Sequence, residues 1–276
     1  MHYFTNRKDT LGVESTALGN TGVAYFNQGD VDEARAYLRK ALKIDKKTGR
    51  KSSEALRLGY IGHIFWTKGH LNKALKSLED ALKIYREIDN RNGEALTLGT
   101  IGRIFMLKSE LGKALKYQKD SIRIYREIDY WNGEALALGE IGLIYLKKGD
   151  FNKALKYHKE ALMIHREINH KEGEALNLGY IGDVFKIKRD FYKALKYYND
   201  ALKIHREIDD RQGLIWDLVK ISLIYITRKS KGYLDRALKY LREALNILDT
   251  YKLVYGRDII QKAIDSITKK VSGGNS

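Results

Sequence analysis

One pattern of about forty residues recurs along this sequence, and it limits the possible folds more than any other feature. The segment "GEALALGEIGLIYLKKGDFNKALKYHKEALMIHREI", residues 133–168, has close copies forty residues before it and forty residues after it. A repeat of this length is one structural unit that cannot bury its apolar face alone, so neighbouring copies must stack to build a core. Because no linker-like run divides the copies, the sequence predicts one continuous repeat body.

Each copy is predicted to form two antiparallel helices joined by a short turn. Apolar residues recur at helical spacing in both halves of the copy, and the whole sequence contains no proline. An all-α protein follows. The predicted buried positions of the quoted copy are Leu138, Ile141, Ile144, Tyr145, Ala154, Leu155, Ala161, Leu162 and Ile168.

A glycine recurs inside the first helix of the copies. Glycine in a helix interior costs about 0.5–1 kcal/mol relative to alanine, so its repetition requires compensation. We expect this compensation to come from close packing of the two helices of a pair. The recurring glycines are Gly22, Gly62, Gly102, Gly142 and Gly182.

The repeat resembles the tetratricopeptide repeat. The residues that carry the resemblance are Ile141, Gly142, Tyr145, Gly149, Ala154 and Ala161, and the same frame fits Ile61, Gly62, Phe65, Gly69, Ala74 and Ala81. The resemblance implies a right-handed superhelical solenoid of about six helix pairs, with the first helices lining a concave groove.

Two features depart from the usual pattern of that family. The proline that commonly closes its second helix is replaced by Arg86, Arg126, Arg166 and Arg206, and the repeat has 40 residues instead of about 34. The greater length is similar to the long-repeat subgroup of the Pins/LGN adaptors, which bind partner peptides.

The repeat frame also predicts the boundaries within the chain. Residues 227–235, "TRKSKGYLD", hold three extra residues and are expected to form a longer basic turn. The expected capping helix would place Ile259, Ile260, Ala263, Ile264 and Ile267 along one side. The predicted parts are an N-terminal extension or the end of an upstream helix (1–12), six repeats (13–52, 53–92, 93–132, 133–172, 173–212 and 213–256), a capping helix (257–271) and a mobile tail (272–276).

The composition narrows the classes of function. The chain carries 51 Lys and Arg residues against 35 Asp and Glu residues, a formal charge of +16, and the excess is concentrated in residues 1–52 and 213–276. The absence of cysteine excludes disulfides, thiolate metal sites and a cysteine nucleophile. No apolar run approaches the roughly 18 residues needed to cross a bilayer, so we expect no membrane insertion and a cytoplasmic location.

Candidate binding residues come from comparing the copies with one another. Positions where the copies agree are interpreted as set by the fold, whereas first-helix positions where they differ are free to contact a ligand. The candidates are Asn20, Val23, Phe26, Asn27, Tyr60, His63, Trp66, Arg103, Met106, Leu143, Leu146, Lys147, Tyr180, Asp183 and Lys186, and the same comparison also marks Thr67, Thr100, Leu107, Glu140 and Ile187.

Among these candidates, an apolar track suits the apolar side of a helix or an extended peptide. The charged candidates Arg103, Lys147, Asp183 and Lys186 would then fix its register, and the ligand could carry acidic residues. The alternative is that curvature of the solenoid buries the track against neighbouring repeats. The track consists of Phe26, Trp66, Met106, Leu143 and Leu146.

Two rows of lysines in the second helices could follow the phosphates of a nucleic acid. The rows are Lys73, Lys113, Lys153 and Lys193, and Lys76, Lys116, Lys156 and Lys196. Each lysine of the second row has an acid four residues later, which favours a solvated face with helix-stabilising pairs. Weak, non-specific nucleic-acid binding at the basic ends, at Arg228, Lys229, Lys231, Lys269 and Lys270, is the remaining expectation.

No pattern in the sequence argues for catalysis, a metal or a cofactor. His158 and His165 lie seven residues apart, whereas zinc ligation from one helix requires a spacing of about four. Because Tyr85 and Tyr125 occupy the place of His165, packing between repeats is the favoured role. The predicted function is that of a non-enzymatic adaptor holding a protein or peptide; the alternatives are a nucleic-acid-binding solenoid and a regulatory or self-assembling domain of a larger protein.

Overall fold

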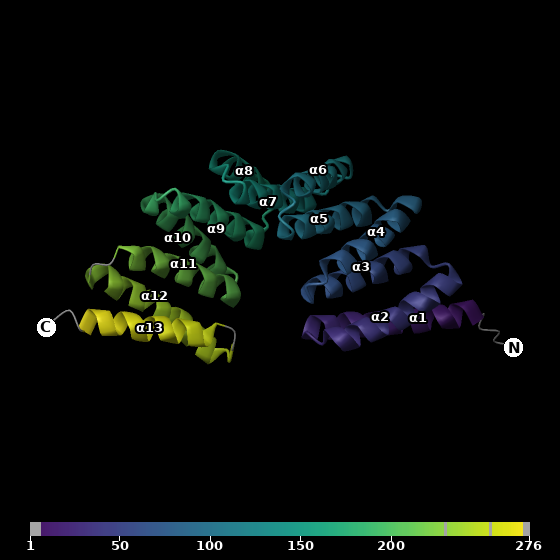
Figure 1. Ribbon diagram of the computed structural model, residues 1–276, viewed down its shortest axis with the longest axis horizontal. Coiled ribbons are helices and arrows are strands. Elements are labelled where there is room, and N and C mark those ends of the chain that lie inside the picture. Colours follow the sequence, from purple (N-terminus) through teal and green to yellow (C-terminus); the bar gives the residue numbers. More distant parts are fainter. Residues whose placement is uncertain (1–6, 229–230, 254–255, 273–276) are drawn as a thin grey trace. The chain divides into compact units, whose positions relative to one another are not determined.

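The structure, a computed structural model, describes residues 7–228, 231–253 and 256–272 (Figure 1). No strand occurs in these ranges, which confirms the predicted all-α class. The fold is a solenoid of stacked helix pairs. The helices are α1 (Arg7–Gln28), α2 (Val31–Thr48), α3 (Lys51–Thr67), α4 (Leu71–Glu87), α5 (Arg91–Leu107), α6 (Leu111–Glu127), α7 (Trp131–Lys147), α8 (Phe151–Glu167), α9 (Lys171–Ile187), α10 (Phe191–Glu207), α11 (Arg211–Thr227), α12 (Lys231–Thr250) and α13 (Arg257–Ser272).

The contacts of the chain cluster in two compact units, residues 1–140 and 141–276, where the sequence suggested one continuous body. The division falls within α7. In the first unit, α1 pairs with α2, α3 with α4 and α5 with α6, while α2 also packs on α3 and α4 on α5. In the second unit, α9 pairs with α10 and α11 with α12, while α8 packs on α9 and α13 packs on α12.

Helix length is set by a backbone signal that recurs every twenty residues. At these positions φ lies between 51° and 89°, which ends one helix and turns the chain into the next. Glycine adopts this conformation without strain, and Asp and Asn tolerate it better than most other residues. The positions are Gly29, Gly49, Gly69, Asp89, Ser109, Asp129, Gly149, Asn169, Arg189 and Asp209.

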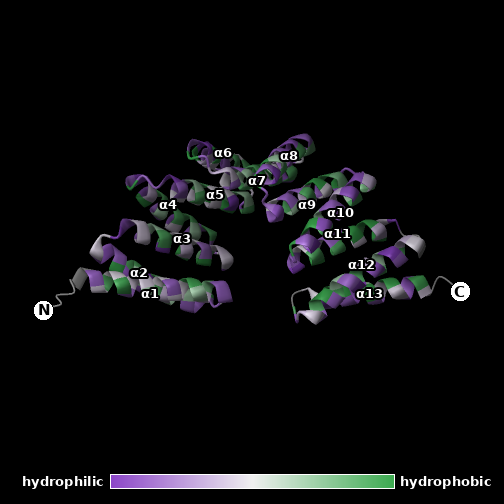
Figure 2. Ribbon diagram, turned by 180° about the vertical axis from the view of Figure 1, so that it is seen from behind, coloured by the Kyte–Doolittle hydropathy of each residue, from purple (hydrophilic) through white to green (hydrophobic). Residues whose placement is uncertain are grey.

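Close packing between the two helices of a pair accounts for the recurring glycines, as predicted. A Cβ atom on Gly62 would lie 2.8 Å from Cγ of Leu78, and one on Gly142 would lie 2.6 Å from the ring of His158. Figure 2 shows hydrophobic and hydrophilic stretches alternating along the helices, as this packing requires. The glycines let each second helix place a large side chain directly against the first.

Gly62→Ala is expected to lower the free energy of unfolding of the first unit by about 1–3 kcal/mol, because the added methyl group overpacks the contact with Leu78. Gly59 provides a matched control in the same helix, since a Cβ atom there would meet nothing within 4 Å. Gly59→Ala should instead stabilise by about 0.5–1 kcal/mol through helix propensity. Urea denaturation compares the two, and equal effects would refute the packing role.

Three of the four arginines that replace the family proline form a repeated bridge between pairs, whereas Arg206 bonds instead to Glu243 of α12. Nε of Arg86 donates to Oε1 of Glu94 at 2.8 Å, and Arg126 and Arg166 make the equivalent bonds to Glu134 and Glu174 at 2.6 and 2.8 Å. Each of these bridging glutamates is largely buried. The departure from the family pattern therefore joins the end of one pair to the start of the next.

At the start of the chain, the structure differs from the expected boundary. α1 begins at Arg7, so residues 7–12 are continuous with the first helix of the first pair. The other first helices begin two residues before the predicted repeat starts, for example α3 at Lys51 against residue 53.

At the end of the chain, residues 231–235 of the expected longer turn belong to α12, which has 20 residues, and residues 229 and 230 lie outside the described residues. Ile260, Ile264 and Ile267 of α13 are buried, but Ile259 is 74% exposed, so placing it on the same side was wrong. Its side chain lies about 100° from that of Ile260, off the i, i+4, i+7 stripe. The mobile tail was predicted for residues 272–276, of which 273–276 lie outside the described residues.

Candidate functional site

In the first unit, side-chain contacts connect the outer sides of consecutive first helices. The ring of Phe26 in α1 lies edge-on to Tyr60 in α3, with 6.0 Å between centroids. The guanidinium of Arg103 in α5 lies 4.7 Å from the Trp66 ring centroid in α3, and its Nε lies 3.3 Å from Oε1 of Glu140 in α7. We call the sides of α1, α3, α5 and residues 131–140 of α7 that face away from the second helices their outer sides, and together they form the first-unit surface.

In the second unit, α9 and α11 are connected in the same way. Nζ of Lys220 in α11 donates to Oδ2 of Asp183 in α9 at 2.9 Å. The other carboxylate oxygen of Asp183 accepts a bond of 2.7 Å from the hydroxyl of the buried Tyr198, and Lys186 lies 3.7 Å away. The outer sides of α9 and α11, with residues 141–147 of α7, form the second-unit surface.

None of the fifteen candidate residues is fully buried. Asn20, Asn27, Arg103 and Lys147 are exposed, and the others are partly buried. Tyr60, Trp66 and Arg103 make side-chain contacts on the first-unit surface. Asp183 and Lys186 lie within ion-pair distance of each other on the second-unit surface. The predicted apolar track is partly buried along its whole length: Phe26, Trp66, Met106, Leu143 and Leu146.

A row of exposed apolar side chains, one in each of five copies, was missed by comparison of the copies. Positions where the copies agree were interpreted as set by the fold, so the leucines there were not among the candidates. In the structure they point outward, with between 44% and 61% of each side chain exposed. Helical phase could have found them, since Leu96 lies seven residues, about two turns, before the candidate Arg103 and so shares its exposed side of the helix. The row consists of Leu56, Leu96, Leu136, Leu176 and Trp216.

A pocket lies between consecutive first helices in each unit, at equivalent places in the repeat. The first-unit pocket, between α5 and α7, has a volume of about 150 Å³ and is lined by Leu96, Gln118 and Glu140 among others. The second-unit pocket, between α9 and α11, has a volume of about 540 Å³. Leu176 and Trp216 of the second-unit pocket are the equivalents, two repeats later, of Leu96 and Leu136 of the first-unit pocket.

The two pockets hold polar groups of different character. In the first-unit pocket, Oε1 of Gln118 and Oε2 of Glu140 are buried without a hydrogen-bond partner, and burial raises the pKa of Glu140 against the opposing effect of Arg103. In the second-unit pocket, Oδ2 of Asp217 lies 2.8 Å from Nδ1 of His205. Burial raises the pKa of Asp217, although the bond to His205 opposes the shift.

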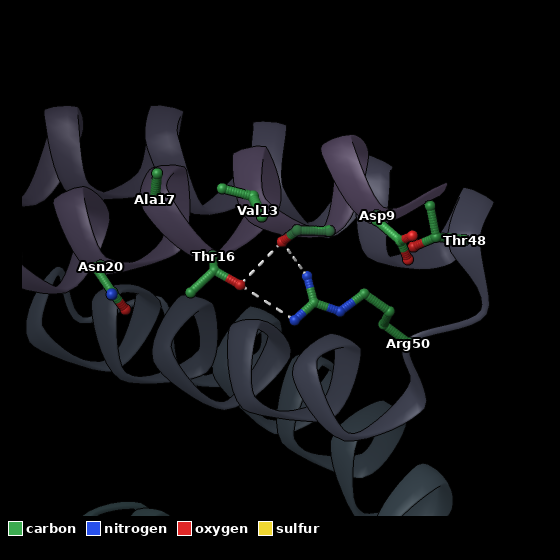
Figure 3. A pocket seen from close by; sticks show the side chains of 8 residues that line it. Asp9, Val13, Thr16, Ala17, Asn20, Thr48 and Arg50 are labelled. Carbon is green, nitrogen blue, oxygen red and sulfur yellow. Dashed lines mark hydrogen bonds between the residues drawn. The ribbon is translucent and has the colours of Figure 1, made fainter. Parts of the chain in front are cut away.

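A third cavity, of about 710 Å³, lies beside the start of α1 (Figure 3). Arg50 donates there to the carbonyl oxygen of Gly12 and, at 3.1 Å, to Oγ1 of Thr16. Thr16 itself donates to the same carbonyl at 2.9 Å. The guanidinium of Arg50 therefore joins the start of α3 to α1.

The histidines pack between helices, as predicted. His158 lies against Gly142, and His165 lies against Gly173. Burial lowers the pKa of each to about 4, so both are neutral at pH 7. Among the described residues, no three His, Asp or Glu side chains group as metal ligands, and no helix is long and apolar enough to cross a membrane.

The lysines of the second helices are partly paired within the chain. In the first row, Lys113, Lys153 and Lys193 lie 2.6–2.9 Å from the acid three residues earlier. In the second row, each lysine was expected to pair with the acid four residues later. One of these expected pairs is at ion-pair distance in the structure, Lys156 with Glu160 at 3.9 Å. The Lys229 and Lys231 side chains of the basic end lie outside the described residues.

Comparison with known proteins agrees with the geometry. The family model described as tetratricopeptide repeat matches residues 13–87 and 90–167, more than half of the chain. The chain belongs to the tetratricopeptide repeat family. No curated protein matches the sequence.

Several solved structures share the tetratricopeptide repeat solenoid. A Signal Transduction ATPase with Numerous Domains (STAND) protein from Pyrococcus horikoshii, with a tetratricopeptide repeat sensor, is 19% identical with a TM-score of 0.73; the match covers 92% of this chain and 38% of that protein. A Rap protein complexed with Competence and Sporulation Factor is 16% identical with a TM-score of 0.67, covering 94% and 76%. PilF of Pseudomonas aeruginosa is 19% identical with a TM-score of 0.59, covering 92% and 99%. At these identities the likeness shows the fold alone.

Proposed function

We propose that this chain is a non-catalytic, cytoplasmic adaptor that binds a protein or peptide on the outer sides of its first helices. The observation that carries the proposal is the exposed row of Leu56, Leu96, Leu136, Leu176 and Trp216. Leu56, Leu96 and Leu136 belong to the first-unit surface, and Leu176 and Trp216 to the second-unit surface; exposed large apolar side chains that recur in this way on each unit are of the kind that marks interaction sites. Apolar side chains of a helix or an extended peptide would pack against those of either unit.

The polar residues beside the row support a binding surface with fixed geometry. Arg103 is held between the Trp66 ring and Glu140, so its side chain is ordered before a ligand arrives. Preorganised side chains lose less conformational entropy on binding, which favours affinity. Tetratricopeptide repeat proteins commonly serve as interaction scaffolds, and one similar structure is a Rap protein complexed with Competence and Sporulation Factor.

The expectation of acidic ligand residues carries less weight than the apolar row. Arg103 and Lys186 each lie within ion-pair distance of a carboxylate of the chain itself, at 3.3 Å from Glu140 and 3.7 Å from Asp183. Each of these cations therefore already has a counter-charge within the chain, although Lys186 shares Asp183 with Lys220. We infer that apolar contacts supply most of the affinity and that the charged residues set the register.

Affinity capture from native lysate, with and without nuclease, tests the proposal. We expect the same protein partners to be retained in both conditions, because the binding surface is apolar. Partners that disappear after nuclease treatment would instead favour the nucleic-acid alternative, whose affinity also falls steeply with salt. Recovery of further copies of this chain alone would favour self-assembly.

A further inference from the structure

The second-unit pocket combines apolar walls with an exposed aromatic ring. Leu176 and Ala175 of α9 form one side, and Trp216 of α11 forms the other, with 52% of the tryptophan exposed. Tyr180 also lines the pocket. A volume of about 540 Å³ is sufficient for a long amino-acid side chain and part of its backbone.

Three carboxylates line the same pocket. Asp217 is 3% exposed and is bonded through Oδ2 to Nδ1 of His205 at 2.8 Å. Asp210 lies on the opposite side of that imidazole, with 3.5 Å between its Oδ2 and Nε2 of His205. Glu172 also lines the pocket, and its side chain is 66% exposed. Acidic groups therefore lie both in the interior and toward solvent.

The cation of the pocket, Lys220, acts on one of these carboxylates: burial raises the pKa of Asp217, and the charge of Lys220 opposes that larger effect. Its Nζ donates to Asp183, which is not one of the residues lining the pocket, at 2.9 Å. The same Nζ lies 5.8 Å from the ring centroid of Tyr180 and 5.5 Å from that of Tyr198. Because three carboxylates and this one lysine line the pocket, the pocket keeps an excess of negative charge.

We propose that the second-unit pocket binds a basic side chain, lysine or arginine, of a peptide ligand. The inference deepens the proposed function and rests on it. The aliphatic part of the side chain would pack along Leu176 and Ala175. Its cationic end would lie near Asp217 and Glu172 and against the face of the Trp216 ring, where a cation is attracted to the π system.

The equivalent pocket of the first unit lacks these groups, which makes basic-residue recognition a property of the second-unit pocket. Leu136, Ala137 and Glu140 occupy the places of Trp216, Asp217 and Lys220. Stacking of the repeats is therefore achieved without an indole or a buried aspartate at these positions. Asp217 is bonded to His205, which takes the place of Tyr125 in the first unit, and a ligand with a cation would account for the exposed Trp216 beside it.

Three tryptophans, Trp66, Trp131 and Trp216, give the test a site-specific readout. The full chain with ¹⁵N-labelled tryptophan is titrated with capped tripeptides Ala-Lys-Ala, Ala-Arg-Ala, Ala-norleucine-Ala and Ala-Glu-Ala. We expect the lysine and arginine peptides to shift the Trp216 indole resonance in a saturable manner. Binding of the norleucine peptide should be at least about tenfold weaker, since it lacks only the charge.

Variants of the carboxylates separate the charge from the shape of the pocket. Asp217→Asn and Glu172→Gln should each weaken binding of the lysine peptide by about tenfold, a factor that corresponds to 1.4 kcal/mol. Glu172 is exposed, so its variant will fold even if Asp217→Asn does not. Asp209→Asn is the matched control, because Asp209 is 70% exposed, pairs with Arg211 and does not line the pocket.

Equal binding of the lysine and norleucine peptides, an unmoved Trp216 resonance, or unchanged affinity in both carboxylate variants would overturn the inference. The proposed function fails in a different way. If Trp66→Ala abolishes capture of the natural partner while Trp216 ignores basic peptides, the adaptor function stands and the pocket assignment is wrong.

Discussion

Asp45→Ala is expected to detach the first helix pair from the rest of the first unit. Asp45 of α2 is fully buried, and its Oδ2 lies 3.7 Å from Nε of Arg57 in α3, which is 4% exposed. The hydroxyl of Ser15 in α1 donates to the other carboxylate oxygen at 2.5 Å. One carboxylate thus holds groups from α1 and α3 against α2.

Removing this carboxylate leaves the guanidinium of Arg57 buried without its counter-charge. Breaking one partner of a buried ion pair costs about 3–5 kcal/mol, a large part of the roughly 5–15 kcal/mol that keeps a domain folded. Because repeat proteins are stabilised by nearest-neighbour interfaces, α1 and α2 should unfold first. Amide hydrogen exchange should therefore show early loss of protection in residues 7–48.

Another copy supplies the control. Tyr85 and Thr97 occupy the places of Asp45 and Arg57 one repeat later. Tyr85 packs directly on Gly93, whose place is taken by Ser53 in the first copy, so the control also needs Ser53→Gly. The triple variant Asp45→Tyr, Ser53→Gly and Arg57→Thr removes both charges together and makes room for the ring, so it should recover most of the stability lost in Asp45→Ala. Unchanged exchange in the single variant, or a triple variant less stable than the single, would contradict the role of the ion pair.

The helix pairs and their contacts could be predicted from the sequence because they depend on local periodicity. Gly62 and Gly142 recur at one place in the repeat, and the expected close packing is present at both. The Arg86 series was visible as a departure from the family pattern, but its partner Glu94 was not. The bond joins two helices through a turn whose geometry the sequence alone does not specify.

The exposed leucine row was missed for a different reason. Agreement between copies was interpreted as a requirement of the fold, yet Leu96 and its equivalents recur and are exposed. A repeated ligand surface and a repeated core produce the same agreement in sequence. The rotation of each helix about its axis separates the two, and the spacing of seven residues between Leu96 and Arg103 is the sign of it in the sequence.

The Asp45–Arg57 and His205–Asp217 pairs were also invisible to pattern reading. In each pair the residues lie twelve positions apart on adjacent helices. Single charged residues at helical positions are usually solvated, so nothing in the sequence marks these as buried. Their burial follows from space that neighbouring glycines leave open, as at Gly19, where a Cβ atom would lie 2.0 Å from Cζ of Arg57.

Trp66→Ala is expected to weaken binding of the natural partner by about thirtyfold or more, since loss of an aromatic anchor commonly costs 2 kcal/mol or more. The indole is partly exposed, lies 4.7 Å from the guanidinium of Arg103 and 5.6 Å from the ring of His63, and has no equivalent indole in the other copies at that place. Stacking of the repeats therefore does not require it. Helicity and thermal melting of the variant should be close to those of the wild type.

Arg103→Glu should weaken binding as well, because it places a carboxylate beside Glu140 and removes the cation from the indole. Two control variants make comparable changes, the loss of an aromatic ring and the reversal of a charge, on second helices. Tyr192→Ala removes an aromatic ring that is 80% exposed on α10, and Lys113→Glu reverses a charge on α6. Neither control should alter binding.

The most direct test of binding at the first helices is calorimetric titration of the captured partner into the wild type and these four variants. The binding surface predicts a loss of about thirtyfold or more for Trp66→Ala, a clear loss for Arg103→Glu, and wild-type affinity for Tyr192→Ala and Lys113→Glu. Wild-type affinity in both first-helix variants, with a loss in either control, would place the partner on the second helices. That result would contradict the proposal that the partner binds at the first helices.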